Sequence, residues 1–283
     1  MTATTASVEQ ALRQRRDGGG KALVPFVTAG ITENWTDYVR ACADNGADAI
    51  EIGLPFSDPM LDGPVIQAAS TQALARGART DALLEEVGAI GCQVPLIVMT
   101  YSNIVGRHGY EAFCAKLSAA GIRGLIVPDT PVDEIEPLRS ATEAAGVELI
   151  LLVAPSTRPH RVSRIAELSR GFVYAVSNMG VTGLRNTVSA TVRTTVSAIR
   201  DETSLPVLVG FGISTPAQAV EASHSSDGVV VASALMRDVL AGGSATELAA
   251  TISTFRSALD SELWHAQPEL AGPAGASHSS SER

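Results

Sequence analysis

Two carboxylates lie close together in the sequence, on either side of a loop rich in proline and glycine. Glu51 lies within the mostly apolar run Ala47–Gly53, and Asp62 lies at the end of the loop that follows. A strand and loop of this kind would bring both side chains to one pocket, and paired carboxylates suit acid/base catalysis. The structural alternative pairs Glu51 with a basic residue, but residues 41–75 contain no Lys, Arg or His. We favour a catalytic role, because an unpaired ionisable group is costly inside a buried strand.

The remainder of the chain predicts the elements that position these residues. Short runs rich in Val, Ile and Leu alternate with longer amphipathic stretches. The predicted strands are Ala22–Thr28, Ala47–Gly53, Pro95–Tyr101, Gly124–Asp129, Glu148–Ala154, Phe172–Ser177, Pro206–Gly210 and Gly228–Val231. Eight strands, each followed by a helix, predict a closed (β/α)8 TIM barrel, with an open doubly wound sheet as the alternative.

The two ends of the chain fall outside this repeat. An extra N-terminal helix over Val8–Arg16, stopped by Gly18–Gly20, would cover the bottom of the barrel. We expect residues 1–266 to form a single catalytic domain. The tail of residues 267–283 is rich in Ala, Gly, Ser and Pro, and we expect it to be disordered.

Composition narrows the class of protein. The net charge of −9, from 21 basic and 30 acidic residues, argues against a nucleic-acid surface. No apolar run approaches the roughly 18 residues of a membrane span, and the polar N-terminus does not resemble a signal peptide, so we expect a cytoplasmic protein. Cys42, Cys92 and Cys114 have no metal-ligand or redox spacing and are predicted to be small core residues. We expect no metal site.

In a barrel of this kind the active site forms at the carboxyl ends of the strands. Gly210-Phe211-Gly212 after the seventh strand, and Ser233 after the eighth, could hold a phosphate through backbone amides; tight turns alone are the alternative. Phe26, Tyr101 and Phe211 lie near strand ends, where they could fill the core or line a slot for a flat substrate.

Other nucleophiles are disfavoured. Ser177 and Ser233 have no evident His partner for a hydrolase triad. Lys21 and Lys116 do not follow the end of a predicted strand, which argues against Schiff-base chemistry. The five histidines lie in predicted helices, loops or the tail, and we expect solvated surface positions for them; they are His108, His160, His224, His265 and His278.

The motifs at the strand ends resemble those of the tryptophan synthase alpha chain family. The run from Ile50 to Gly63 matches that family's signature along its whole length. The resemblance covers roughly Ala22 to Leu240, in the same order. The other matching segments are Pro25–Thr28, Tyr101–Asn103, Pro128–Val132, Gly180–Gly183 and Gly210–Ser214.

The resemblance implies a retro-aldol cleavage of indole-3-glycerol phosphate to indole and glyceraldehyde 3-phosphate, without a cofactor. Glu51 would be the general acid/base, Asp62 would stay ionised and accept the indole N–H, and Tyr174 would support them. Around the indole it implies Phe26, Ile66, Tyr101 and Phe211. Around the phosphate it implies Gly183, Gly212, Ala232 and Ser233, with Thr182 as a further substrate-binding residue.

The resemblance also implies a partner, a pyridoxal-phosphate beta subunit that receives the indole. The interface residues that it implies are Pro55, Asp58, Asn103 and Pro131, and residues 180–186 would form a lid. Two positions depart from the family's pattern. Asn178 replaces a basic residue at the base of the lid, and Ala232 replaces a glycine of the phosphate loop.

Three alternatives remain open on the sequence. The first is a stand-alone indole-3-glycerol phosphate lyase that supplies free indole to a specialised pathway. The second is a catalytically weak barrel that mainly activates a beta subunit, although intact Glu51 and Asp62 weigh against it. The third is another phosphate-binding barrel, an isomerase or a decarboxylating synthase, for which a strand-end Lys or an Asp in another position is expected.

Overall fold

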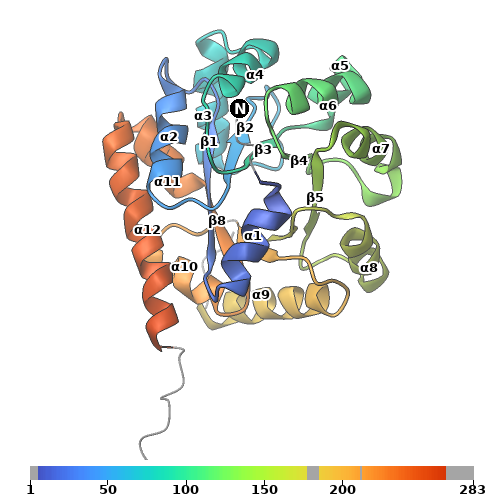
Figure 1. Cartoon of the computed structure of the whole chain (residues 1–283), viewed down its shortest axis with the longest axis vertical. Coiled ribbons are helices and arrows are strands. Elements are labelled where there is room, and N and C mark those ends of the chain that lie inside the picture. The colour runs from blue at the N-terminus through green and yellow to red at the C-terminus, as the bar shows by residue number, and fades with distance from the viewer. Residues whose placement is uncertain (1–5, 177–184, 211, 266–283) are drawn as a thin grey trace, which may run out of the picture.

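Eight parallel strands close into a barrel in the computed structural model, which describes residues 6–176, 185–210 and 212–265 (Figure 1). Each strand pairs with the next along the chain, and β1 pairs with β8. The strands are β1 Ala22–Thr28, β2 Ile50–Gly53, β3 Leu96–Met99, β4 Gly124–Ile126, β5 Glu148–Val153, β6 Val173–Val176, β7 Val207–Gly210 and β8 Gly228–Val231. This confirms the predicted closed barrel over the open sheet.

The strands lie where the sequence predicts them, although several are shorter. Buried apolar side chains fill both faces of the sheet, which is why the strands read as nearly continuous apolar runs. β2 begins at Ile50 rather than Ala47, and the side chain of Asp48 just before it accepts a hydrogen bond from the Leu23 N–H at 2.8 Å.

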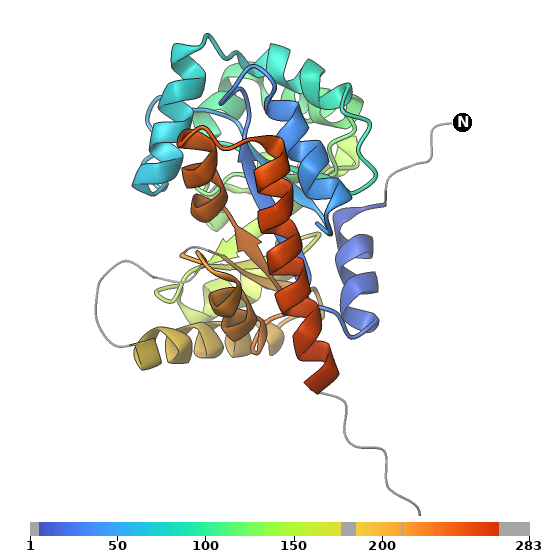
Figure 2. The ribbon, with the colours of Figure 1, turned by 90° about the vertical axis from the view of Figure 1, so that its left-hand side faces the viewer.

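Helices surround the barrel (Figure 1). The helices are α2 Trp35–Asp44, α3 Pro64–Ala75, α4 Thr80–Gly88, α5 Ser102–His108, α6 Tyr110–Ala119, the 3₁₀ turn η1 Val132–Glu134, α7 Glu136–Ala145, α8 Pro159–Leu168, α9 Arg185–Arg200, α10 Pro216–Ser223, α11 Ser233–Leu240 and α12 Ala245–His265. The longest of them, α12, lies along one side, where it packs against α2 and α10 (Figure 2). No helix of the described residues is long and apolar enough to cross a membrane.

The predicted N-terminal helix is present as α1, Val8–Asp17, at the amino-terminal end of the barrel. Val8 and Leu12 are buried there. The carboxylate of Glu148, at the start of β5, accepts hydrogen bonds from the Val8 N–H at 2.5 Å and the Glu9 N–H at 3.2 Å. A carboxylate at a helix N-terminus satisfies otherwise free amides and favours the positive end of the helix dipole. Glu148 therefore anchors α1 to the barrel.

The cysteines and the C-terminal tail are the remaining features that the sequence analysis addressed. Cys42 and Cys114 are buried and Cys92 is half-buried, and all three are free thiols. The tail of residues 267–283 lies outside the described residues, so its predicted disorder stays a prediction.

Replacing Glu148 with Ala should lower the free energy of unfolding by about 1–3 kcal/mol, because two backbone amides of α1 lose a charged acceptor. Urea unfolding followed by circular dichroism measures this change. Glu85→Ala, on the exposed face of α4, is the control and should be close to neutral. Equal stability of the two variants would contradict the anchoring role of Glu148.

Candidate active site

Glu51 lies on β2, and its side chain is buried in the barrel. It is only 1% exposed, and in register it lies between Phe26 of β1 and Ile97 of β3. Its Oε2 atom has no hydrogen-bond partner within the described part of the chain. Burial raises the pKa of Glu51 to about 8, and the negative charge of Asp62 adds to that rise. The side chain therefore holds a proton near neutrality.

Asp62 lies at the far end of the loop that follows β2, and it is half-buried. Its Oδ2 accepts a hydrogen bond from the Tyr101 hydroxyl at 3.1 Å, and its carbonyl accepts one from the Gln67 side chain at 2.8 Å. Burial raises the pKa of Asp62 to about 6, while the hydrogen bond from Tyr101 opposes that rise. At neutral pH the two carboxyl groups thus differ in protonation, with Asp62 ionised and Glu51 neutral.

Tyr174 lies on β6 and is almost fully buried. Burial, followed by the charges of Glu51 and Asp62, raises the pKa of its phenol well above the ordinary value. A side chain at Gly210, the last residue of β7, would overlap the Tyr174 ring, so glycine makes room for it there.

Of the apolar residues predicted to surround a flat substrate, Phe26 pairs in register with Glu51 and Tyr101 donates a hydrogen bond to Asp62. Phe26 is buried on β1, and its ring fills the space that a Cβ at Gly53 would need. Tyr101 is buried and stacks on Phe56 of the loop after β2, with ring centroids 5.0 Å apart. Ile66 is buried on α3. Phe211 lies outside the described residues.

The predicted phosphate end is partly described. Gly212 is exposed and has a φ of +80°, a conformation that favours glycine. Ser233 is the first residue of α11, and Ala232 is its N-cap with a φ of −119°. Because this φ is negative, the position does not require the left-handed conformation that favours glycine. The amides at the start of α11 can therefore still face an anion.

Several predicted residues lie outside the described residues, namely Asn178, Thr182 and Gly183. Of the predicted lid, residues 180–186, the first five also lie outside the described residues, and residues 185 and 186 belong to α9. The roles of these residues stay predictions.

The predicted interface residues differ in exposure. Asp58, Asn103 and Pro131 are exposed, whereas Pro55 is buried in this chain. The loop after β2 also carries two exposed apolar side chains that were not predicted, Met60 at 76% and Leu61 at 47% exposure. The apolar pair in a loop otherwise rich in Pro, Asp and Gly is the sequence signal that could have identified them.

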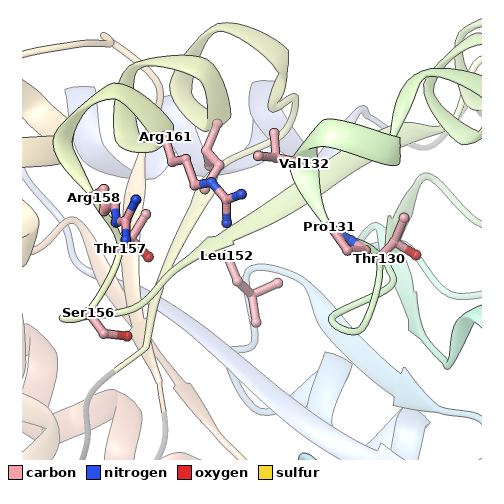
Figure 3. Close-up of a pocket in the computed structure, with 9 residues that line it drawn as sticks. Thr130, Pro131, Val132, Leu152, Ser156, Thr157, Arg158 and Arg161 are labelled. Carbon is pink, nitrogen blue, oxygen red and sulfur yellow. The ribbon is translucent and has the colours of Figure 1, made fainter.

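A pocket of about 460 Å³ that the sequence analysis did not predict lies beside the ends of β4 and β5 (Figure 3). Thr130 and Pro131 line one side, and Arg158 and Arg161 line the other. Arg161 forms an ion pair with Asp133. Neither Glu51 nor Asp62 lines this pocket, so it is separate from the carboxylate pair.

The histidines whose side chains the structure describes are His108, His160 and His224. His160 and His224 are exposed, as predicted. The prediction was wrong for His108, which is half-buried, with Nδ1 2.9 Å from the Ile104 carbonyl oxygen. Among the described residues, no group of three or more His, Cys, Asp or Glu side chains could hold a metal ion.

Fold and site together define a (β/α)8-barrel protein with two carboxyl groups of unlike protonation near the carboxyl end of β2. The family model for the tryptophan synthase alpha chain matches residues 12–261. The tryptophan synthase alpha chain of Gloeobacter violaceus is 48% identical over 237 residues, which cover 82% of this chain and 85% of the relative. The chain belongs to the tryptophan synthase alpha chain family.

Solved structures agree with this assignment. Tryptophan synthase from M. tuberculosis, in an open form with BRD0059 bound, contains a chain with a TM-score of 0.82 and 34% identity; the match covers 90% of this chain and 99% of that one. Tryptophan synthase subunit alpha from Legionella pneumophila str. Paris matches with a TM-score of 0.82 and 30% identity, over 90% of this chain and 98% of that one.

The raised pKa of Glu51 predicts a measurable effect on stability. Between the ordinary glutamate pKa of 4.5 and about 8, the folded chain keeps a proton that the unfolded chain releases. The contribution of Glu51 to stability therefore falls as pH rises through this window. Glu51→Gln removes the titration, so the free energy of unfolding of the variant relative to the wild type should be higher at pH 8 than at pH 5, by roughly 3–4 kcal/mol. Urea unfolding of both proteins at several pH values measures the difference, and a difference independent of pH would count against the buried acid.

Proposed function

We propose that this chain cleaves indole-3-glycerol phosphate to indole and glyceraldehyde 3-phosphate, as the alpha subunit of tryptophan synthase. The observation that carries the proposal is the pair formed by Glu51 and Asp62, whose pKa values of about 8 and about 6 leave one protonated and one ionised at neutral pH. A retro-aldol cleavage at an indole ring needs both a proton donor and a fixed negative charge.

The proton of Glu51 is delivered to C3 of the indole ring. This protonation converts the ring to a cation whose positive charge is shared with N1, and the ionised Asp62 accepts the N1–H and stabilises that charge. The bond between C3 and the side-chain carbinol then breaks, and its electron pair restores the aromatic ring. The carbinol becomes an aldehyde as its hydroxyl proton passes to the Glu51 carboxylate, which regains the proton that it gave. No group is consumed, and the ring itself accepts the electrons.

The surroundings of the pair fit a flat, phosphorylated substrate. Phe26, Ile66 and Tyr101 supply apolar surface close to the carboxylates, where an indole ring can lie. The backbone at Gly212 and the start of α11 at Ser233 supply amide donors for the phosphate. Tyr174 stays neutral beside both carboxyl groups and can donate a hydrogen bond there.

The partner in this proposal is a pyridoxal-phosphate beta subunit that receives the indole. Exposed Asp58 and Pro131 lie on the loops after β2 and β4, and exposed Asn103 lies in the first turn of α5, after β3. The exposed Met60 adds apolar surface two residues after Asp58. An exposed apolar patch on a polar loop is typical of an interaction surface. We place this assembly in the cytoplasm, as the sequence predicts.

Glu51→Gln should abolish indole release, because the amide cannot deliver or regain a proton. Asp62→Asn should lower kcat by about 10²–10³-fold, since it removes the charge that stabilises the ring cation. The measurement is the steady-state rate of indole release from indole-3-glycerol phosphate, with and without a beta subunit. Glu85→Gln, the same chemical change on exposed α4, is the control and should keep the wild-type rate.

Wild-type turnover by Glu51→Gln would contradict the mechanism. A fast wild-type rate that the beta subunit does not change would identify a stand-alone lyase instead, and a wild-type chain that releases no indole under either condition would contradict the proposed reaction.

Asp58→Ala should reduce stimulation by the beta subunit about tenfold, a loss of roughly 1.4 kcal/mol of coupling, and affect the basal rate less. Titrating the beta subunit into each variant and recording the rate of indole release measures both quantities. Asp201→Ala, an exposed aspartate beyond the end of α9, is the matched control. If Asp58→Ala lowered basal and stimulated rates by the same factor, Asp58 would have no specific role at the interface.

A further inference from the structure

The hydroxyl group of Tyr101 makes two hydrogen bonds to the loop that carries Asp62. It donates to Oδ2 of Asp62 at 3.1 Å and accepts from the backbone N–H of Leu61 at 3.2 Å. The two contacts are compatible, because the hydroxyl donates its one proton to the carboxylate and accepts the Leu61 N–H on its oxygen. The same oxygen thereby fixes both the side chain of Asp62 and the backbone just before it.

The loop needs such a contact because its tip is exposed. Met60 and Leu61 face solvent. Within the loop, the Asp62 N–H donates to the Pro59 carbonyl at 3.0 Å, a bond between near neighbours that shapes the turn without tying it to the barrel. Tyr101 follows a different strand, β3, and is the N-cap of α5, so its hydroxyl can hold the loop relative to the barrel.

Tyr101 is itself held on two sides. Its ring is buried and stacks on Phe56, with the ring planes 26° apart. The next residue, Ser102, begins α5, and Asp129 after β4 accepts hydrogen bonds from the Ser102 N–H at 2.8 Å and from its hydroxyl at 2.7 Å. The position of the hydroxyl is therefore fixed before a substrate arrives.

The hydroxyl group of Tyr101 stays protonated and therefore remains a hydrogen-bond donor. Burial, followed by the charge of Asp62, raises the pKa of Tyr101, so the phenol keeps its proton across the working range of the enzyme. A neutral donor stabilises the ionised form of Asp62 and opposes the effect of burial on that carboxyl group.

We propose that Tyr101 is a positioning residue, whose hydroxyl holds Asp62 ionised and aimed at the ring N–H of the substrate. The role is distinct from that of the Tyr101 ring, which supplies apolar surface. The inference rests on the proposed function of Asp62, but the hold of Tyr101 on Asp62 can be measured without substrate.

The test is Tyr101→Phe, which keeps the ring and removes only the hydroxyl. The pH dependence of kcat should have an acidic limb set by Asp62, and this limb should move upward by roughly half to one pH unit in the variant. We expect kcat to fall about tenfold or more, with KM changed by less than about threefold, because a contact that acts in the transition state is lost. Tyr38→Phe is the matched control. It removes the hydroxyl of a tyrosine on α2, which donates a hydrogen bond to the Gly243 carbonyl and contacts neither carboxyl group of the site.

A second readout needs no turnover. ¹³C NMR titration of the Asp62 carboxyl group, assigned with Asp62→Asn, should show a higher pKa in Tyr101→Phe than in the wild type and no change in Tyr38→Phe. An unchanged pKa of Asp62 would overturn the inference even if the chain released no indole. If the wild type is active and Tyr101→Phe changes only KM, the ring alone matters and the positioning role is likewise overturned. A wild type without activity would instead contradict the proposed function.

Discussion

The burial of one unpaired carboxyl group, that of Glu51, is the constraint on which the rest of this site depends. A carboxylate inside a barrel wall pays a large desolvation cost, and the group avoids it by keeping its proton. Because Glu51 keeps its proton, it can act as an acid at a pH where ordinary glutamates are ionised. Stability and function are therefore opposed at this position, as is common where a fold carries chemistry.

The closed barrel makes the two carboxyl groups different from one another. Glu51 sits in the ladder itself, between β1 and β3, and has no described partner for Oε2. Asp62 lies on a loop at the rim, only half-buried and bound to the Tyr101 hydroxyl, so its pKa rises less. Two residues eleven positions apart thus reach opposite protonation states because one belongs to a strand and the other to its loop.

Much of this arrangement could be predicted from the sequence, because it follows from local pattern. Apolar runs of strand length gave eight strands, and the absence of nearby basic residues identified Glu51 as unpaired. Contacts between distant segments could not be predicted in this way. The hydrogen bond from Tyr101 to Asp62 and the anchoring of α1 by Glu148 join segments that are distant in the sequence. The partial burial of His108 depends on how the helices pack, which hydrophobic periodicity does not reveal. The pocket beside Arg158 and Arg161 likewise exists only once β4, β5 and α8 are placed together.

The acid role of Glu51 is tested most directly by its protonation state in the folded protein without substrate. ¹³C NMR of carboxyl-labelled glutamate, with the signal assigned by its loss in Glu51→Gln, reports the pKa of this one side chain. We expect Glu51 to titrate near pH 8 and to give the signal of a neutral acid at pH 6.5. A Glu51 already ionised at pH 6.5 would contradict the acid role, because such a group could not deliver the proton on which the proposed cleavage depends.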